Sequence, residues 1–103
     1  MYKMRESTIE KAVNKYARSL GWLAYKFTSP SCRGVCDAIY FRNEITLLIE
    51  FKQLGKKATK LQQHHINKLR EQLIPVYVVD SILQGKGIFN EYQENTKQTT
   101  PVI

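Results

Sequence analysis

Apolar side chains recur along the chain at the spacing of a helix in two segments. In the first segment they occupy positions three and four apart, at Ile9, Ala12, Val13, Tyr16, Ala17 and Leu20. Ser7 or Thr8 could cap the start of this amphipathic helix, and Gly21 would end it. A second helix is predicted to begin after Thr59 and to end before Pro75. Its inner face would consist of Leu61, His65, Ile66, Leu69 and Leu73.

Shorter apolar runs predict the strands. Residues 22–27 form one strand, and the runs 35–41 and 45–51 form a β-hairpin around a turn at 42–44. The all-apolar run 76–79 is typical of a strand buried on both faces, which indicates a sheet covered by helices. Asp80 or Ser81 would then cap a short final helix.

This order of elements predicts an α/β fold. It reads helix, strand, hairpin, helix, strand, with a mixed sheet flanked by helices. A chain of 103 residues is long enough for one compact core only. We therefore expect a single domain over residues 1–95. The chain is polar and without periodicity from about Glu94 onward, and residues 96–103 are expected to form a flexible tail.

Charge adds a prediction about partners. Sixteen Lys and Arg residues stand against nine Asp and Glu, for a formal charge of +7, and this excess attracts polyanions such as nucleic acid. Two cysteines are too few for the disulfide framework of a small secreted domain. No signal peptide and no membrane span is predicted, because the apolar runs are short. The sequence thus favours a cytoplasmic protein.

Two charged residues interrupt the run TLLIEFKQ where burial should be deepest. Side chains alternate between the faces of a strand, so Glu50 and Lys52 share one face while Ile49 and Phe51 occupy the other. Burial costs such charges several kcal/mol each unless they are paired or hold a metal. One interpretation is a solvated strand end with a cross-strand ion pair, and the other is a reactive site.

Asp37 favours the reactive site, because it lies between apolar neighbours on the predicted partner strand. The turn at 42–44 would bring this strand beside Glu50. Two adjacent carboxylates repel unless one is protonated or a cation bridges them, and oxygen ligands suit Mg²⁺ or Mn²⁺. Such a cation can activate water, while Lys52 orients the nucleophile or stabilises the developing anion. The three residues therefore predict phosphodiester hydrolysis.

The motifs that carry these residues resemble a known nuclease family. GVCD at 34–37 followed by IEFK at 49–52 resembles the D…(D/E)xK signature of the PD-(D/E)XK, or restriction-endonuclease-like, superfamily. The successive runs KFTSPSCRGVCDAIYF, LLIEFKQLGKKATKLQ and IPVYVVDS resemble more closely the virus-type replication and repair nucleases, known as VRR-Nuc. One departure is Cys36, which stands where the family usually has Pro.

The resemblance implies a restriction-endonuclease-like core and a role for each motif residue. Asp37 and Glu50 would bind Mg²⁺ or Mn²⁺, and Lys52 would be catalytic. Gln62 matches by spacing a characteristic Gln on the following helix, with Gln63 as the less favoured neighbour.

A further metal-binding Glu is expected on the first helix, where two positions are open. The spacing from Gly21, similar to that in archaeal Holliday junction resolvases, favours Glu10, whereas the family's E-x-x-I pattern favours Glu6. Alternatively, Glu10 forms a capping box with Ser7.

The resemblance also implies the partners. The chain would be a homodimeric endonuclease that cuts branched DNA, in particular four-way (Holliday) junctions, in a bacterial or virus-infected bacterial cell. Basic residues flanking the site are candidates for phosphate contacts: Lys26, Arg33, Lys56, Lys57 and Lys60.

Three other functions stay open at this point. The chain could be a non-catalytic nucleic-acid-binding module, or a nuclease of flaps or linear DNA. Cys32, Cys36, His64 and His65 offer four ligands for zinc, although their spacing is unusual for a structural site.

Overall fold

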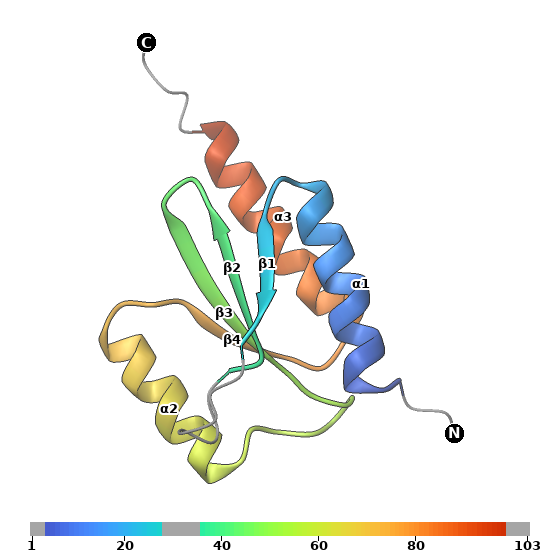
Figure 1. Cartoon of the computed structure of the whole chain (residues 1–103), viewed down its shortest axis with the longest axis vertical. Coiled ribbons are helices and arrows are strands. Elements are labelled where there is room, and N and C mark those ends of the chain that lie inside the picture. Colours follow the sequence, from blue (N-terminus) through green and yellow to red (C-terminus); the bar gives the residue numbers. More distant parts are fainter. Residues whose placement is uncertain (1–3, 28–35, 99–103) are drawn as a thin grey trace.

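Three helices and a four-stranded sheet make up the described part of the chain, residues 4–27 and 36–98 of a computed structural model (Figure 1). The elements are α1 (Glu6–Ser19), β1 (Leu23–Lys26), β2 (Ala38–Arg42), β3 (Ile45–Phe51), α2 (Lys60–Glu71), β4 (Val76–Val79) and α3 (Ile82–Gln98). The strand order is β1-β2-β3-β4. The β1–β2 and β2–β3 pairs are antiparallel, and β3 pairs with β4 in parallel. The predicted α/β architecture with a mixed sheet is confirmed.

Helices cover both faces of the sheet. α1 and α3 lie side by side on one face, and α2 lies on the other (Figure 1). Gly85 allows α1 and α3 to approach closely, because a Cβ at this position would lie 2.4 Å from Cγ2 of Val13. No helix in the described ranges is long and apolar enough to cross a membrane.

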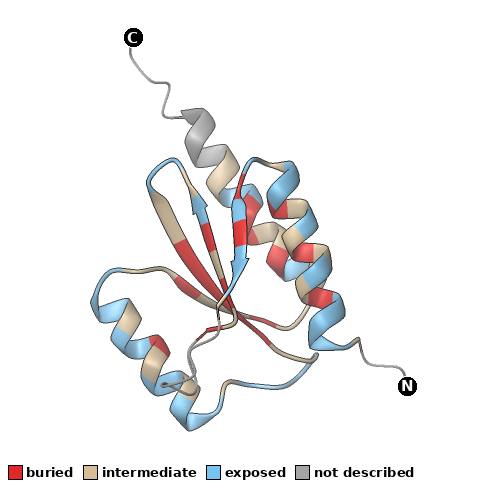
Figure 2. Ribbon diagram, in the orientation of Figure 1, coloured by how far each residue is buried: buried red, intermediate tan, exposed pale blue. Residues whose placement is uncertain are grey.

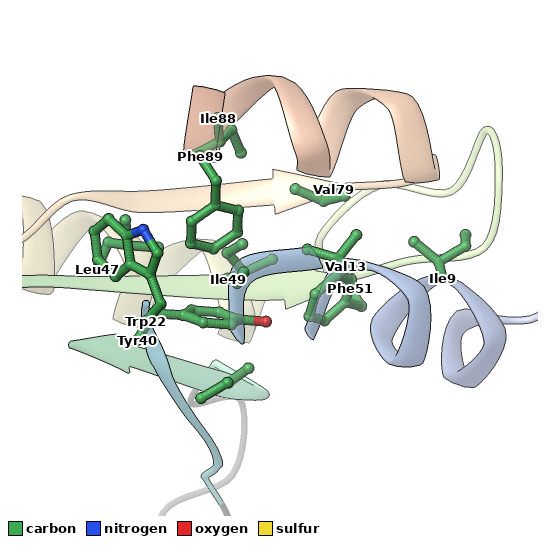
Figure 3. Packing of buried hydrophobic residues seen from close by; sticks show 13 residues of the cluster. Ile9, Val13, Trp22, Tyr40, Leu47, Ile49, Phe51, Val79, Ile88 and Phe89 are labelled. Atoms are coloured by element: carbon green, nitrogen blue, oxygen red, sulfur yellow. The ribbon is translucent and has the colours of Figure 1, made fainter. Parts of the chain in front are cut away.

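The main core lies between the sheet and the α1–α3 pair. Ile9 and Val13 of α1 and Phe89 of α3 point toward the β3 side chains Ile49 and Phe51 (Figure 3). A smaller cluster on the opposite face joins α2 to the sheet through Cys36, Leu48, Ile66 and Val76. α2 is exposed along most of its length, and Ile66 is its buried residue (Figure 2). The central strand β3 therefore contributes to both clusters.

The first helix begins earlier than its sequence predicts. Arg5 is the N-cap, and its carbonyl accepts the N–H groups of Thr8 and Ile9. Ser7 and Thr8 thus belong to the first turn, and the predicted caps are wrong, as is the Ser7 capping box. The backbone of Arg5 satisfies the helix start without a side-chain cap. Gly21 follows the helix end at a φ of 93°, so the predicted stop is confirmed.

The second helix has the predicted bounds but a narrower inner face. Thr59 is its N-cap, and the helix ends at Glu71, before Pro75. Leu61 is 48% exposed and Leu73 is 90% exposed, so neither belongs to the inner face. The reason is that α2 packs against the sheet through Ile66 and Leu69, and Leu73 follows the helix in a left-handed conformation with a φ of 63°.

The last helix is longer than predicted. Ser81 accepts the N–H of Gln84, as expected of a cap, but α3 then continues for 17 residues to Gln98. It therefore includes residues 94–98, where the polar sequence predicted no regular structure. Packing of Ile88 and Phe89 in the core stabilises the helix, and helical structure extends from this anchor past the last apolar position.

Candidate active site at the open end of the hairpin

The hairpin brings Asp37 and Glu50 together, as the sequence predicts. Ala38 pairs with Ile49, so the same register places Asp37 opposite Glu50. The Phe51 N–H donates to Oδ2 of Asp37 at 3.0 Å. The Asp37 carbonyl accepts the N–H of Phe27 at 2.7 Å. Asp37 is therefore fixed between β1 and β3, just before β2 begins.

Glu50 is the buried charged residue of the described core, with 2% of its surface exposed. Nε2 of Gln62 donates to Oε1 of Glu50 at 3.0 Å. Among the described residues, no N–H group or hydroxyl donates to Oε2 of Glu50, and the neighbouring acidic group is the Asp37 carboxylate. Burial first, and then the adjacent Asp37 carboxylate, raise the pKa of Glu50 to about 8, whereas Lys52 opposes this rise. The site thus holds a carboxyl group that gives up its proton only with difficulty.

Lys52 directly follows β3 and is partly buried. Its backbone N–H donates to the carbonyl of Val79 at 2.8 Å, which continues the β3–β4 pairing by one residue. Its positive charge lowers the pKa of Glu50, so the ammonium group acts on this carboxyl group from nearby. Asp37, Glu50 and Lys52 therefore gather at one end of the sheet.

The helix-one acids lie near this group without joining it. Oε1 of Glu10 lies 3.9 Å from Nζ of Lys26, and 14% of the Glu10 side chain is exposed. Burial raises the pKa of Glu10, Lys26 lowers it, and the charge of Asp37 raises it. Glu6 is exposed, and its charge raises the pKa of both Glu10 and Glu50.

Among the described residues, no third carboxylate joins Asp37 and Glu50 to complete a metal-binding cluster. Within residues 4–27 and 36–98, no three His, Cys, Asp or Glu side chains lie close enough together to hold one metal ion. Only Asp37 and Glu50 of the predicted ligands are therefore brought into direct proximity. Glu10 is turned toward Lys26 instead, because that lysine offers an ion pair at the end of β1.

Basic residues lie in the loop before α2 and at the start of this helix. Lys56, Lys57 and Lys60 are exposed and line a shallow hollow of about 480 Å³. Lys26 lies on the α1 side, in its pair with Glu10. Arg33 lies outside the described residues. Three of the five predicted phosphate-binding residues thus share one surface.

Cys36 is buried in the apolar cluster under α2. Burial first, and then the charges of Glu50 and Asp37, raise the pKa of its thiol to about 12. The thiol is therefore neutral and a poor metal ligand or nucleophile at ordinary pH. Cys32, the other cysteine of the zinc hypothesis, lies outside the described residues.

Sequence reasoning missed the role of Asp80. Its Oδ2 accepts the N–H of Gly55 at 3.1 Å, which anchors the basic loop to the end of β4. The sequence predicts Asp80 only as a possible cap of the final helix. Because β3 and β4 are parallel, their ends meet at one edge of the sheet, and an acid after β4 could have been placed near the loop that follows β3.

Known proteins share both the sequence and the fold. No protein-family model matches the chain. The chain is 37% identical over 82 residues to the "Putative nuclease p44" of Acyrthosiphon pisum secondary endosymbiont phage 1, over 79% of this chain and 88% of the phage protein. A solved structure of a VRR_NUC domain matches its fold with a TM-score of 0.78, at 21% identity, over 84% of this chain and 96% of that domain. The chain belongs to the VRR-Nuc family. Both the family and the fold predicted from the motifs are thereby confirmed.

Proposed function

We propose that this VRR-Nuc protein is a divalent-metal-dependent nuclease that hydrolyses DNA phosphodiester bonds at Asp37, Glu50 and Lys52. The observation that carries the proposal is the buried Glu50 carboxyl group, which has one unpartnered oxygen beside a second carboxylate. Such an arrangement destabilises the fold, because burial and like charge both oppose ionisation. A function that needs negative charge at this point explains why it is present.

The donor set fits a hard divalent cation. Oε2 of Glu50 is buried without a described partner, and Asp37 supplies a second carboxylate close by. Oxygen ligands of this kind favour Mg²⁺ and Mn²⁺ over softer metals. A cation held by these residues would offset the like-charge repulsion that, after burial, raises the pKa of Glu50. Asp37 and Glu50 are therefore the residues that would hold the ion.

The surrounding side chains have distinct roles in this proposal. When bound, a divalent cation neutralises phosphodiester charge and lowers the pKa of an attacking water. The Lys52 ammonium stabilises the negative charge that develops on the phosphate oxygens. Gln62 holds the Glu50 carboxylate by its hydrogen bond to Oε1. Glu10 adds negative charge on the α1 side, where it is partly buried and interacts with Asp37, whereas Glu6 is exposed.

The proposed substrate, DNA, is a polyanion, and the net positive charge of the chain attracts it. The formal charge is +7, and Lys56, Lys57 and Lys60 line one hollow at the start of α2, the helix that carries Gln62. These lysines bind backbone phosphates next to the cut and position the duplex without selecting its sequence. Lys26, the last residue of β1, and Arg33 are further candidates for phosphate contacts.

The preferred DNA is a four-way junction, and the active form is a homodimer in the cytoplasm of a bacterial or phage-infected cell. Support comes from the similarity of the motifs to Holliday junction resolvases and from a relative encoded by a phage. A two-fold dimer carries two sites, which suits symmetric cuts across a four-way junction. Light scattering on the eluting protein measures the mass of the active form.

A cleavage assay tests the function. Labelled four-way junction, flap and linear duplex are incubated with the protein in Mn²⁺, Mg²⁺ or EDTA. Lys52→Ala removes the charge at the site, and Lys68→Ala removes an exposed charge in the last turn of α2 as a matched control. We expect metal-dependent paired cuts in the junction, a loss of about 10²–10³-fold in Lys52→Ala, and full activity in Lys68→Ala.

Each other outcome changes a different part of the proposal. Cutting of flaps or linear duplex at equal rates would keep the nuclease and reject the junction preference. Binding without cleavage in any metal would identify a non-catalytic nucleic-acid-binding module. Equal activity of Lys52→Ala and Lys68→Ala would remove Lys52 from the mechanism.

A further inference from the structure

Thr59 is connected to the candidate metal ligand Glu50 through one side chain. Oγ1 of Thr59 accepts the backbone N–H of Gln62 at 3.2 Å, and the Thr59 N–H donates to Oε1 of Gln62 at 2.9 Å. The two bonds form a capping box at the start of α2. The other end of the same amide, Nε2 of Gln62, donates to Oε1 of Glu50 at 3.0 Å. Thr59, Gln62 and Glu50 therefore form a continuous chain of hydrogen bonds.

The Thr59 N–H determines which way the Gln62 amide faces. A carboxamide has an acceptor end and a donor end, and the two differ little in shape. Because the Thr59 N–H requires an acceptor, the Gln62 oxygen must face it, and the amino group must face Glu50. A flipped amide would set two oxygens against each other at Glu50 and two donors against each other at Thr59.

We propose that Thr59 is a positioning residue for Glu50, acting through its backbone N–H and the Gln62 amide. This inference rests on the proposed function, since it takes Glu50 to be a metal ligand. The donor from Gln62 occupies Oε1 and leaves the buried Oε2 without a described partner. The capping box thus stabilises the start of α2 and also presents one defined oxygen of Glu50 to the cation.

Three substitutions separate these two roles of Thr59. Thr59→Ser keeps both the hydroxyl and the N–H. Thr59→Ala loses the hydroxyl that caps the helix but keeps the N–H. Thr59→Pro loses both, and the φ of −68° at this position suits proline. The difference between the alanine and proline variants therefore isolates the N–H that orients Gln62.

The test measures Mn²⁺ affinity of the full chain by calorimetry, without DNA. We expect wild type, Thr59→Ser and Thr59→Ala to bind Mn²⁺ within about threefold of one another, although Thr59→Ala melts about 4–8 °C lower. Thr59→Pro should bind about 10-fold more weakly, as does loss of other partners that orient metal ligands. Gln62→Ala should show the same loss, and the double variant Thr59→Pro/Gln62→Ala should be no worse than Gln62→Ala.

Several results would overturn the proposal. Losses that multiply in the double variant would show that Thr59 acts apart from Gln62. Equal losses in Thr59→Ala and Thr59→Pro would assign the effect to the helix cap alone. Unchanged affinity in Thr59→Pro would reject the positioning role while leaving the proposed nuclease intact. Failure of wild type to bind Mn²⁺ would instead reject the metal site and this inference together.

A second measurement keeps the proposal testable if Thr59→Pro does not show a native circular dichroism spectrum. Hydrogen exchange of the Gln62 side-chain amide is followed by NMR in wild type and Thr59→Ala. The proposal requires slowed exchange in both proteins, because both keep the N–H that orients the amide. Exchange at the rate of a free glutamine side chain in wild type would overturn it.

Discussion

The two faces of β3 differ in chemistry although both are buried. Leu47, Ile49 and Phe51 point toward α1 and α3 and form the centre of the main core. Leu48 and Glu50 point toward α2, and there the apolar cluster ends at a carboxyl group. One face therefore stabilises the fold, and the other gives up stability at its end to hold a charge. The period of two in a strand lets adjacent residues serve these different purposes.

Replacing the buried carboxyl group should have the largest effect. In Glu50→Gln we expect cleavage to fall by about 10³-fold or more, because a neutral amide is a poor ligand for a hard cation. Stability in EDTA should rise by about 1–3 kcal/mol at pH 8, since the amide carries no charge to bury. Cleavage assays and urea unfolding measure the two effects. If Glu50→Gln were both active and less stable than wild type, the α2 face of β3 would not be trading stability for function.

The gain in stability should depend on pH. The pKa of Glu50 is raised to about 8 in the folded state, from an ordinary value of 4.5. Between these values the folded protein holds a proton that the unfolded chain has lost, so wild-type stability falls as pH rises. The advantage of Glu50→Gln in EDTA should therefore grow from about pH 4.5 and level off above about pH 8. A constant difference would show that burial does not raise the pKa of this carboxyl group.

A substitution on the face of β3 that packs against α1 and α3 should mainly lower the stability of the fold. Phe51 is 1% exposed in the main core, so Phe51→Ala should lower the free energy of unfolding by about 3–5 kcal/mol. The backbone N–H that binds Asp37 is kept, and the fraction that remains folded should still cleave. Chemical unfolding and cleavage at low temperature measure this pair of effects. A loss of cleavage in fully folded Phe51→Ala would show that the core face of β3 also contributes to catalysis.

Substitutions of Glu10 and Glu6 show which acidic residue of α1 contributes to the site. We expect Glu10→Gln to reduce cleavage by about 10–100-fold and Glu6→Gln by less than about threefold. The reason is that Glu10 is partly buried and interacts with Asp37, whereas Glu6 is exposed. Rates at several Mn²⁺ concentrations distinguish weaker metal binding from slower chemistry. The reverse order would move the role to Glu6.

The smallest effect is expected at the basic hollow. Lys57→Gln should weaken DNA binding a few-fold and reduce the slope of log affinity against log salt by about 1. Lys68→Gln serves as a control with the same change of charge on the far end of α2. Fluorescence anisotropy at several salt concentrations measures both variants. Equal slopes for the two would show that Lys57 does not contact phosphate.

Local patterns were sufficient to predict most of the fold and the centre of the site. The alternation in TLLIEFKQ placed Glu50 and Phe51 on opposite faces, and the hairpin turn set the register that brings Asp37 beside Glu50. Both predictions depend on neighbours in sequence or on one short connection. Thr59, after which the second helix was predicted to begin, is likewise the N-cap of that helix in the structure.

Features that depend on packing between distant elements were not predictable in this way. Leu61 and Leu73 are exposed because of where α2 lies on the sheet. The spacing of apolar residues along the helix does not reveal this position. The length of α3 follows from its packing against α1. The distance of Glu10 from the Asp37–Glu50 pair depends on its contact with Lys26, which joins two elements that no local pattern relates.

The melting temperatures of wild type and Glu50→Gln at pH 8, each in EDTA and in excess Mn²⁺, test the central claim most directly. The claim is that the polar face of β3 gives up stability to hold a cation. We predict that Glu50→Gln melts higher in EDTA, and that Mn²⁺ at about 100 times its Kd raises wild type by about 10 °C or more. The melting temperature of Glu50→Gln should not change when Mn²⁺ is added. An equal shift in both proteins, or none in wild type, would contradict the account.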